Sequence, residues 1–119
     1  GRVFLAGDAA HINNPLGGMG MNGGIHDAMN LTRKLLGVLI HGEPPKTLGR
    51  YERQRRPIAI EYINANTARN KKQLEEQDPV QRQKNQDEWR AIASDKQRSL
   101  AYLKKSSMID ALEKSEALA

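Results

Sequence analysis

The sequence predicts a mostly α-helical chain with one N-terminal strand. Residues 3–6, Val-Phe-Leu-Ala, form a short apolar run that ends at Gly7, which is typical of a strand covered on both faces. Through most of the remaining chain, apolar residues recur at three- and four-residue steps, which indicates amphipathic helices. No second strand candidate follows, so we expect the strand to pair with residues outside this sequence.

The rest of the chain divides at glycines and prolines. Residues 1–45 are predicted to form a strand, a glycine-rich loop and a helix, and residues 46–119 a C-terminal helical region. Pro57 is expected to kink or break the second helix, because proline lacks a backbone N–H. The predicted order after the strand is a loop over 7–19, helices over about 20–39 and 47–77, a third helix with Asp78 as N-cap and Pro79 as its first residue, and a short final helix capped by Ser106 or Ser107.

Composition excludes several classes of function. The 119 residues suffice for one small domain and include no cysteine, so no disulfide or thiolate metal site can form. The three histidines are scattered, and we expect no metal site. No apolar run approaches the ~20 residues that cross a membrane, so a cytoplasmic protein is expected. The net charge is +5, but basic and acidic residues alternate at helical spacing, which favours solvated helix faces over nucleic-acid binding.

The glycine-rich loop contains a misleading pattern. Residues 18–23, Gly-Met-Gly-Met-Asn-Gly, match the G-x-G-x-x-G fingerprint of dinucleotide-phosphate sites. In that fingerprint the first glycine follows its strand directly, whereas about ten residues intervene here. The helix behind it leads to Pro44 and Pro45 and not to a second strand. We therefore reject a phosphate-binding role for this loop.

A longer pattern resembles a known family. Residues 1–11 (GRVFLAGDAAH) and 15–28 (PLGGMGMNGGIHDA) resemble the second FAD-binding motif of the FAD-dependent aromatic-ring hydroxylases of the para-hydroxybenzoate hydroxylase type, and residues 51–57 (YERQRRP) resemble a segment that follows it in that family. The resemblance implies the C-terminal part of such an enzyme, whose parent fold is an α/β FAD-binding fold, Rossmann-like and of the glutathione-reductase type. Missing N-terminal FAD and substrate domains would be its partners, so the chain alone is expected to be inactive.

The resemblance also implies a function. Enzymes of this family hydroxylate a small aromatic substrate with FAD as cofactor, NAD(P)H as co-substrate and O₂. The sequence leaves three points open: the identity of the substrate, the choice between NADH and NADPH, and whether the reaction is a hydroxylation or another flavin-dependent oxidation. The alternative is a non-enzymatic, basic helical interaction module that retains a remnant of the motif. Scarce aromatic residues and interleaved acids count against that alternative.

The resemblance implies cofactor contacts for the strand end and the helix start. Asp8 would accept hydrogen bonds from the ribityl hydroxyls, and Gly7 beside it would allow close approach. The backbone N–H groups of Met21 and Asn22 would stabilise negative charge on the flavin ring. From the residues alone, Asp8 could instead shape a turn and Asn22 could cap the helix.

The loop between these points is predicted to line the flavin ring on its substrate side. Pro15 makes the loop rigid, and Gly17, Gly18 and Gly20 allow the ring to approach the backbone. An ordinary turn is the alternative for this segment. No catalytic residue is identified, so the chemistry of the site is assigned to this flavin-side loop as a whole.

Other polar residues are given structural roles. His11 is predicted to be a packed, hydrogen-bonded histidine, and Asp27 a complement to the helix dipole. The cluster of Arg53, Arg55 and Arg56 is interpreted as a solvated or salt-bridged helix face and not as a contact to FAD phosphates or NAD(P)H. Trp89 is predicted to lie in the core.

Overall fold

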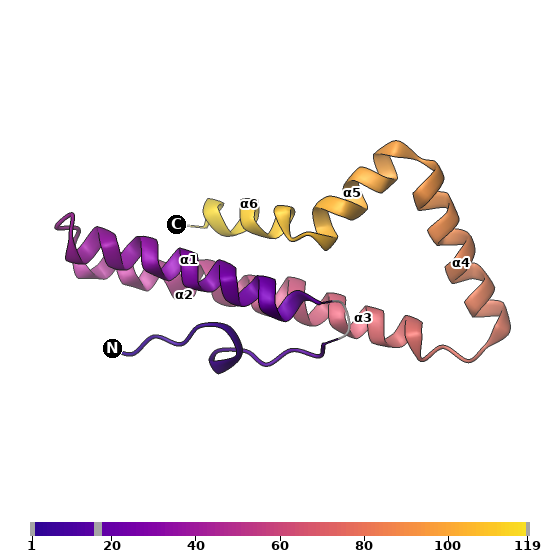
Figure 1. Ribbon diagram of the computed structural model, residues 1–119, viewed down its shortest axis with the longest axis horizontal. Helices are drawn as coiled ribbons and strands as arrows, with labels where there is room; N and C mark the ends of the chain where they lie inside the picture. The colour runs from indigo at the N-terminus through magenta and orange to yellow at the C-terminus, as the bar shows by residue number, and fades with distance from the viewer. Residues whose placement is uncertain (1, 16–17, 119) are drawn as a thin grey trace.

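The structure, a computed structural model, describes residues 2–15 and 18–118, without the side chains of residues 63 and 64. These residues form an elongated molecule of 58 × 29 × 18 Å (Figure 1). None of the helices in these ranges is long and apolar enough to cross a membrane. In order, the elements are η1 (Gly7–Ala9), α1 (Met19–Leu39), η2 (Pro45–Leu48), α2 (Gly49–Ile58), η3 (Ala59–Asn64), α3 (Ala65–Leu74), α4 (Pro79–Ser94), α5 (Lys96–Ser106) and α6 (Ile109–Ala117).

The predicted N-terminal strand is absent from the described residues, which corrects the predicted fold class. The segment before η1 is irregular, although Ala6 has extended dihedral angles of −142° and 151°. The side chains of Val3 and Leu5 are exposed, not covered on two faces. A strand needs a neighbouring strand to pair its backbone groups, and none is present among the described residues. The described residues are therefore helical and form no α/β sheet.

The N-terminal segment runs beside α1 in the opposite direction (Figure 1). Helix α1 begins at Met19, directly after Gly18 with its left-handed φ of 66°, and ends at Leu39. A second left-handed glycine, Gly42, turns the chain toward η2. This antiparallel placement brings η1 into contact with α1.

The second long helical stretch continues past Pro57 without a break. Pro57 lies inside α2, and the chain passes directly into η3, a π-helical segment, and then into α3. A π-helical turn changes the local hydrogen-bond pattern, which is consistent with a missing proline N–H one turn earlier. Asp78 then caps α4 by accepting from the Val80 N–H at 3.2 Å, as the sequence predicts for an Asp-Pro helix start.

The hydrophobic core is small. It consists of the buried side chains Met19, Ile58, Ala59, Met108 and Ala111, with Tyr62 packed against them. The core forms because α6 returns to lie against α2 (Figure 1). Trp89 is not part of it: its side chain is 42% exposed, so the predicted core position of this residue is wrong.

Candidate functional site

A tight turn that follows the N-terminal segment is held against α1. The carbonyl of Gly7 accepts hydrogen bonds from Ala10 N–H at 2.8 Å and His11 N–H at 2.9 Å, which closes the turn over residues 7–11. Gly7 has a φ of 60°, a conformation that favours glycine. A Cβ on Gly24 would lie 3.4 Å from the Cα of Gly7, at van der Waals distance. The turn and the helix therefore pack closely against each other at these two glycines.

Asp27 binds both ends of this turn. Its side chain is buried in α1, and its Oδ2 accepts a hydrogen bond from Gly7 N–H at 3.1 Å and lies 2.7 Å from His11 Nε2. The other ring nitrogen of His11, Nδ1, lies 3.4 Å from Asn13 Nδ2. With Nε2–H donating to Asp27, Nδ1 can accept from Asn13, so a single tautomer satisfies both contacts. His11 is thus hydrogen-bonded and packed, as predicted.

Arg55 binds the second oxygen of the same carboxylate. Its Nε lies 2.6 Å from Asp27 Oδ1, and its side chain is only 4% exposed. Arg55 is therefore salt-bridged, which is one of the two alternatives predicted for the arginine cluster, but it is buried and not solvated. Arg56 does fit that interpretation, since it is exposed and pairs with Glu52 at 3.7 Å. Nη1 and Nη2 of Arg55 are buried without an acceptor among the described residues.

Tyr51 provides a separate attachment for the N-terminal segment. Its hydroxyl donates to the carbonyl of Leu5 at 2.7 Å, and its ring packs edge-on against Phe4 with 6.4 Å between centroids. Burial, followed by the negative charge of Asp27, raises the pKa of Tyr51 to about 12. The hydroxyl therefore remains a donor over the physiological pH range.

The positive charge of Arg55 also acts on His26. Burial lowers the pKa of His26, and the nearby Arg55 lowers it further, while Asp27 acts in the opposite direction. The ring is therefore neutral at pH 7, and its buried Nδ1 has no partner among the described residues.

The three side chains that meet at the Asp27 carboxylate are Asp27 itself, Arg55 and His11. They are called the buried charge cluster below.

The predicted cofactor contacts lie at the exposed edge of this arrangement. Asp8 is exposed at the centre of the turn, between the half-buried Gly7 and His11. Gly17 lies outside the described residues, and Pro15, on the N-terminal side of that gap, is exposed. The remaining predicted residues are the N-cap and the first turn of α1: Gly18, Gly20, Met21 and Asn22.

The start of α1 presents unpaired backbone donors. Because the helix begins at Met19, the N–H groups of Met19, Gly20 and Met21 have no acceptor within the helix. Asn22 is the next residue, so it is not the N-cap of the helix. Its N–H is the first in α1 that can donate a helical hydrogen bond, to the carbonyl of Gly18. The N-cap has no side-chain hydrogen bond, and a Cβ on Gly18 would meet nothing within 4 Å. The described residues therefore leave the positive end of the helix dipole uncovered at Gly18.

The donor set fits the ribityl and ring end of a flavin. An exposed carboxylate can accept from hydroxyl groups, and helix-start N–H groups can donate to a carbonyl that gains negative charge. Gly7 contacts α1 at Gly24, which lies five residues after Met19, or about 7.5 Å along the helix axis. The turn that carries Asp8 therefore contacts the same helix whose first N–H groups have no acceptor within the helix.

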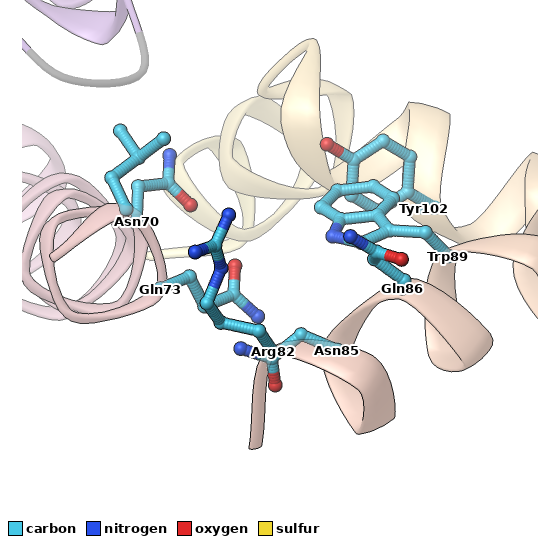
Figure 2. Close-up of a pocket in the computed structure, with 8 residues that line it drawn as sticks. Asn70, Gln73, Arg82, Asn85, Gln86, Trp89 and Tyr102 are labelled. Atoms are coloured by element: carbon cyan, nitrogen blue, oxygen red, sulfur yellow. The ribbon is translucent and has the colours of Figure 1, made fainter. Parts of the chain in front are cut away.

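A pocket of about 340 Å³ lies between α3, α4 and α5 (Figure 2). Amide side chains, Arg82, Trp89 and Tyr102 line it, and Trp89 packs edge-on against Tyr102 with 5.0 Å between centroids. Its lining includes no carboxylate, histidine or hydroxyl nucleophile other than the tyrosine. The turn and the α1 start contribute none of its walls, so it is separate from the candidate flavin site.

Comparison with known proteins identifies the family. The model of the family described as FAD binding domain matches residues 1–66, more than half of the chain. The chain is 44% identical over 82 residues to para-nitrophenol 4-monooxygenase of Pseudomonas sp. (strain WBC-3), which covers 69% of this chain and 20% of that protein. It is 49% identical over 63 residues to rifampicin monooxygenase of Rhodococcus hoagii, and the match covers 53% of this chain and 13% of that protein.

A third relative, anhydrotetracycline monooxygenase of Streptomyces rimosus, is 54% identical over 59 residues, covering 50% of this chain and 12% of that protein. The chain thus spans a fifth or less of the length of these three relatives. No solved structure matches it significantly. The predicted resemblance is confirmed: the chain belongs to the FAD binding domain family, that of the FAD-dependent aromatic hydroxylase-type flavoproteins.

Proposed function

We propose that this chain supplies the ribityl and isoalloxazine contacts of the FAD site in a flavin-dependent monooxygenase. The observation that supports the proposal is the docking of the turn that carries the exposed Asp8 on α1, the helix whose first N–H groups have no acceptor within the helix. FAD, when bound, supplies the redox chemistry, and the protein orients it and tunes its electronics.

Each proposed contact has a defined chemical task. Asp8 accepts hydrogen bonds from ribityl hydroxyls, and such charge-assisted bonds are stronger than neutral ones. The Met21 N–H donates to the flavin carbonyl that becomes more negative on reduction, and the helix dipole adds to this stabilisation. The Asn22 N–H is the weaker donor of the pair, because it also faces the carbonyl of Gly18.

The glycine-rich segment is proposed to lie along the flavin ring. Pro15 and Gly18 border it, and Gly17, outside the described residues, belongs to the same proposal. Gly18 supports this role because its left-handed φ and the open space at its Cα allow a flat ligand to approach the backbone. Gly20 contributes a second surface without a side chain in the first turn of α1.

The overall reaction is proposed from the relatives. Their names describe monooxygenases acting on para-nitrophenol, rifampicin and anhydrotetracycline. We therefore propose that the protein takes part in transferring one oxygen atom from O₂ to an aromatic substrate, with NAD(P)H as the reductant. The nearest candidate for acid–base work, His11, is bound to Asp27, so we assign it a structural role.

Titration of the ¹⁵N-labelled chain with FMN, which carries the ribityl chain and the ring, tests this proposal. NMR shifts detect millimolar affinity, so the test does not depend on tight binding. We expect the amide signals of Asp8, Gly20 and Met21 to move together with FMN concentration, and Asp8→Asn to weaken binding. Signals that stay unchanged there, or shifts confined to Trp89 and its pocket, would contradict the proposal.

A further inference from the structure

We propose that Asp27, supported by Arg55, is a positioning residue for the flavin, because one of its oxygens binds both ends of the turn that carries Asp8. This inference rests on the proposed function and extends it to a buried residue that does not touch the cofactor.

The geometry of the turn supports this role. Asp27 Oδ2 accepts a hydrogen bond from Gly7 N–H at 3.1 Å and lies 2.7 Å from His11 Nε2. Gly7 and His11 are the first and last residues of the turn. The three residues between them are exposed, while Gly7 and His11 are half-buried. One buried oxygen thus fixes both ends, and the exposed part, with Asp8, projects toward solvent. Removal of that oxygen would free the direction of Asp8.

Arg55 makes this arrangement possible. A carboxylate buried without a cation is costly, and Asp27 Oδ1 has the Nε of Arg55 at 2.6 Å. Arg55 comes from α2, so the bond also ties the turn and α1 to a third segment. Tyr51, one turn earlier on α2, binds Leu5 just before the turn. The same helix face therefore holds the N-terminal segment directly at Leu5 and the turn through Asp27.

A purely structural role for Asp27 makes a different prediction. If Asp27 only stabilised the fold, its loss would weaken flavin binding independently of Asp8. If it positions Asp8, the two residues act on the same contact, and their effects on affinity cannot add. A double-mutant cycle separates these possibilities.

The cycle uses FMN affinity of the full chain, measured by NMR titration, for wild type, Asp8→Asn, Asp27→Asn and the double variant. We expect each single variant to weaken affinity by about tenfold, the size of one charge-assisted hydrogen bond. The double variant should be no weaker than the weaker single variant. Fully additive losses, or an Asp27→Asn variant with wild-type affinity, would overturn the inference.

Hydrogen exchange provides a readout that needs no flavin. Gly7 N–H should exchange faster in Asp27→Asn, whereas Ala10 N–H should keep its protection, because its bond to the Gly7 carbonyl is local to the turn. Equal exchange of Gly7 N–H in wild type and variant would overturn the inference. Wild-type protein that shows this protection but does not bind FMN would instead contradict the proposed function.

Three further variants keep the test valid if Asp27→Asn unfolds. Arg55→Lys retains a cation near Asp27 and should weaken FMN binding less than Arg55→Gln does. Arg56→Gln is the matched control, since Arg56 is adjacent on α2 but exposed, and its ion pair among the described residues is with Glu52. Its affinity should equal that of wild type. Equal losses in Arg55→Gln and Arg56→Gln would show a general charge effect and overturn the role of Arg55.

Discussion

Two regions of this chain use charged residues in opposite ways. In the turn, α1 and α2, an aspartate and an arginine are buried and bind each other and the backbone. In α4 and α5 no residue is buried, and charges such as Arg90 and Asp87 pair locally, 3.0 Å apart on the helix surface. The first arrangement requires one geometry, whereas the second tolerates many.

The boundary between these regions coincides with the family match. The buried charge cluster, Tyr51 and the start of α1 all lie within residues 1–66, where the FAD binding domain model matches. Helices α4 and α5 lie outside it and are held by caps at Asp78 and Asp95 and by the Trp89–Tyr102 contact. The comparison indicates that the costly, specific interactions are concentrated where the flavin contacts are proposed.

The largest expected effect breaks the buried ion pair. Asp27→Leu leaves Arg55 buried without its partner, which should lower the free energy of unfolding by about 3–5 kcal/mol. Asp87→Ala, in the exposed pair with Arg90, should cost less than ~1 kcal/mol. Urea denaturation of both variants measures the difference. Equal losses would mean that the two regions do not differ in the way described.

A core substitution tests the same contrast for apolar residues. Ile58 is fully buried between α2 and α6, so Ile58→Ala should cost about 2–5 kcal/mol. Leu100 on α5 is 57% exposed, and Leu100→Ala should cost less than ~1 kcal/mol. Thermal unfolding followed by circular dichroism compares them. A large loss in Leu100→Ala would reveal a contact of α5 that the account lacks.

A glycine pair sharpens the account within the first region. Gly7→Ala places a side chain at a φ of 60° and should cost about 1–2 kcal/mol. Gly20→Ala lies in the first turn of α1, where its Cβ would meet only Asn13 Nδ2 at 3.9 Å, and should stabilise the helix by about 0.5–1 kcal/mol. Denaturant midpoints of the two variants should therefore move in opposite directions from wild type.

The smallest expected effect concerns pH. The folded-state pKa of His26 lies below the ordinary 6.5, so the unfolded chain binds more protons than the folded chain as pH falls below 6.5. Stability from this group is complete above pH 6.5 and is lost as pH falls toward the folded pKa. Replacing Arg55 with glutamine removes a cause of the shift and should raise the His26 pKa, as NMR titration of its ring would detect. An unchanged or lower pKa would contradict this.

The sequence predicts the helical parts and the family well, because both depend on local patterns. The α1 start, the Asp78 cap and the flavin motif can each be recognised over a few residues. The strand prediction failed because a strand depends on a partner, and none exists among the described residues. Local pattern also made Trp89 a core residue, although α4 packs too little to bury it.

The buried charge cluster was missed for a related reason. Tyr51, Gln54, Arg55 and Ile58 are all buried on α2 and follow a spacing of i, i+3, i+4 and i+7. That spacing marks a single helix face, and an arginine on a buried face requires an acidic partner. The signal was present, but neighbouring exposed arginines concealed it. The identity of the partner, Asp27, depends on how α1 packs, which no local pattern specifies.

The central claim is that residues 1–66 provide a working part of a flavin site. The most direct test replaces the corresponding segment of the Pseudomonas para-nitrophenol 4-monooxygenase with these residues and measures the FAD content of the purified, folded chimera. We predict FAD bound at near one equivalent, with a clear reduction when Asp8 is changed to asparagine. A folded chimera without FAD, or one whose FAD content is unaffected by the Asp8 change, would contradict the account.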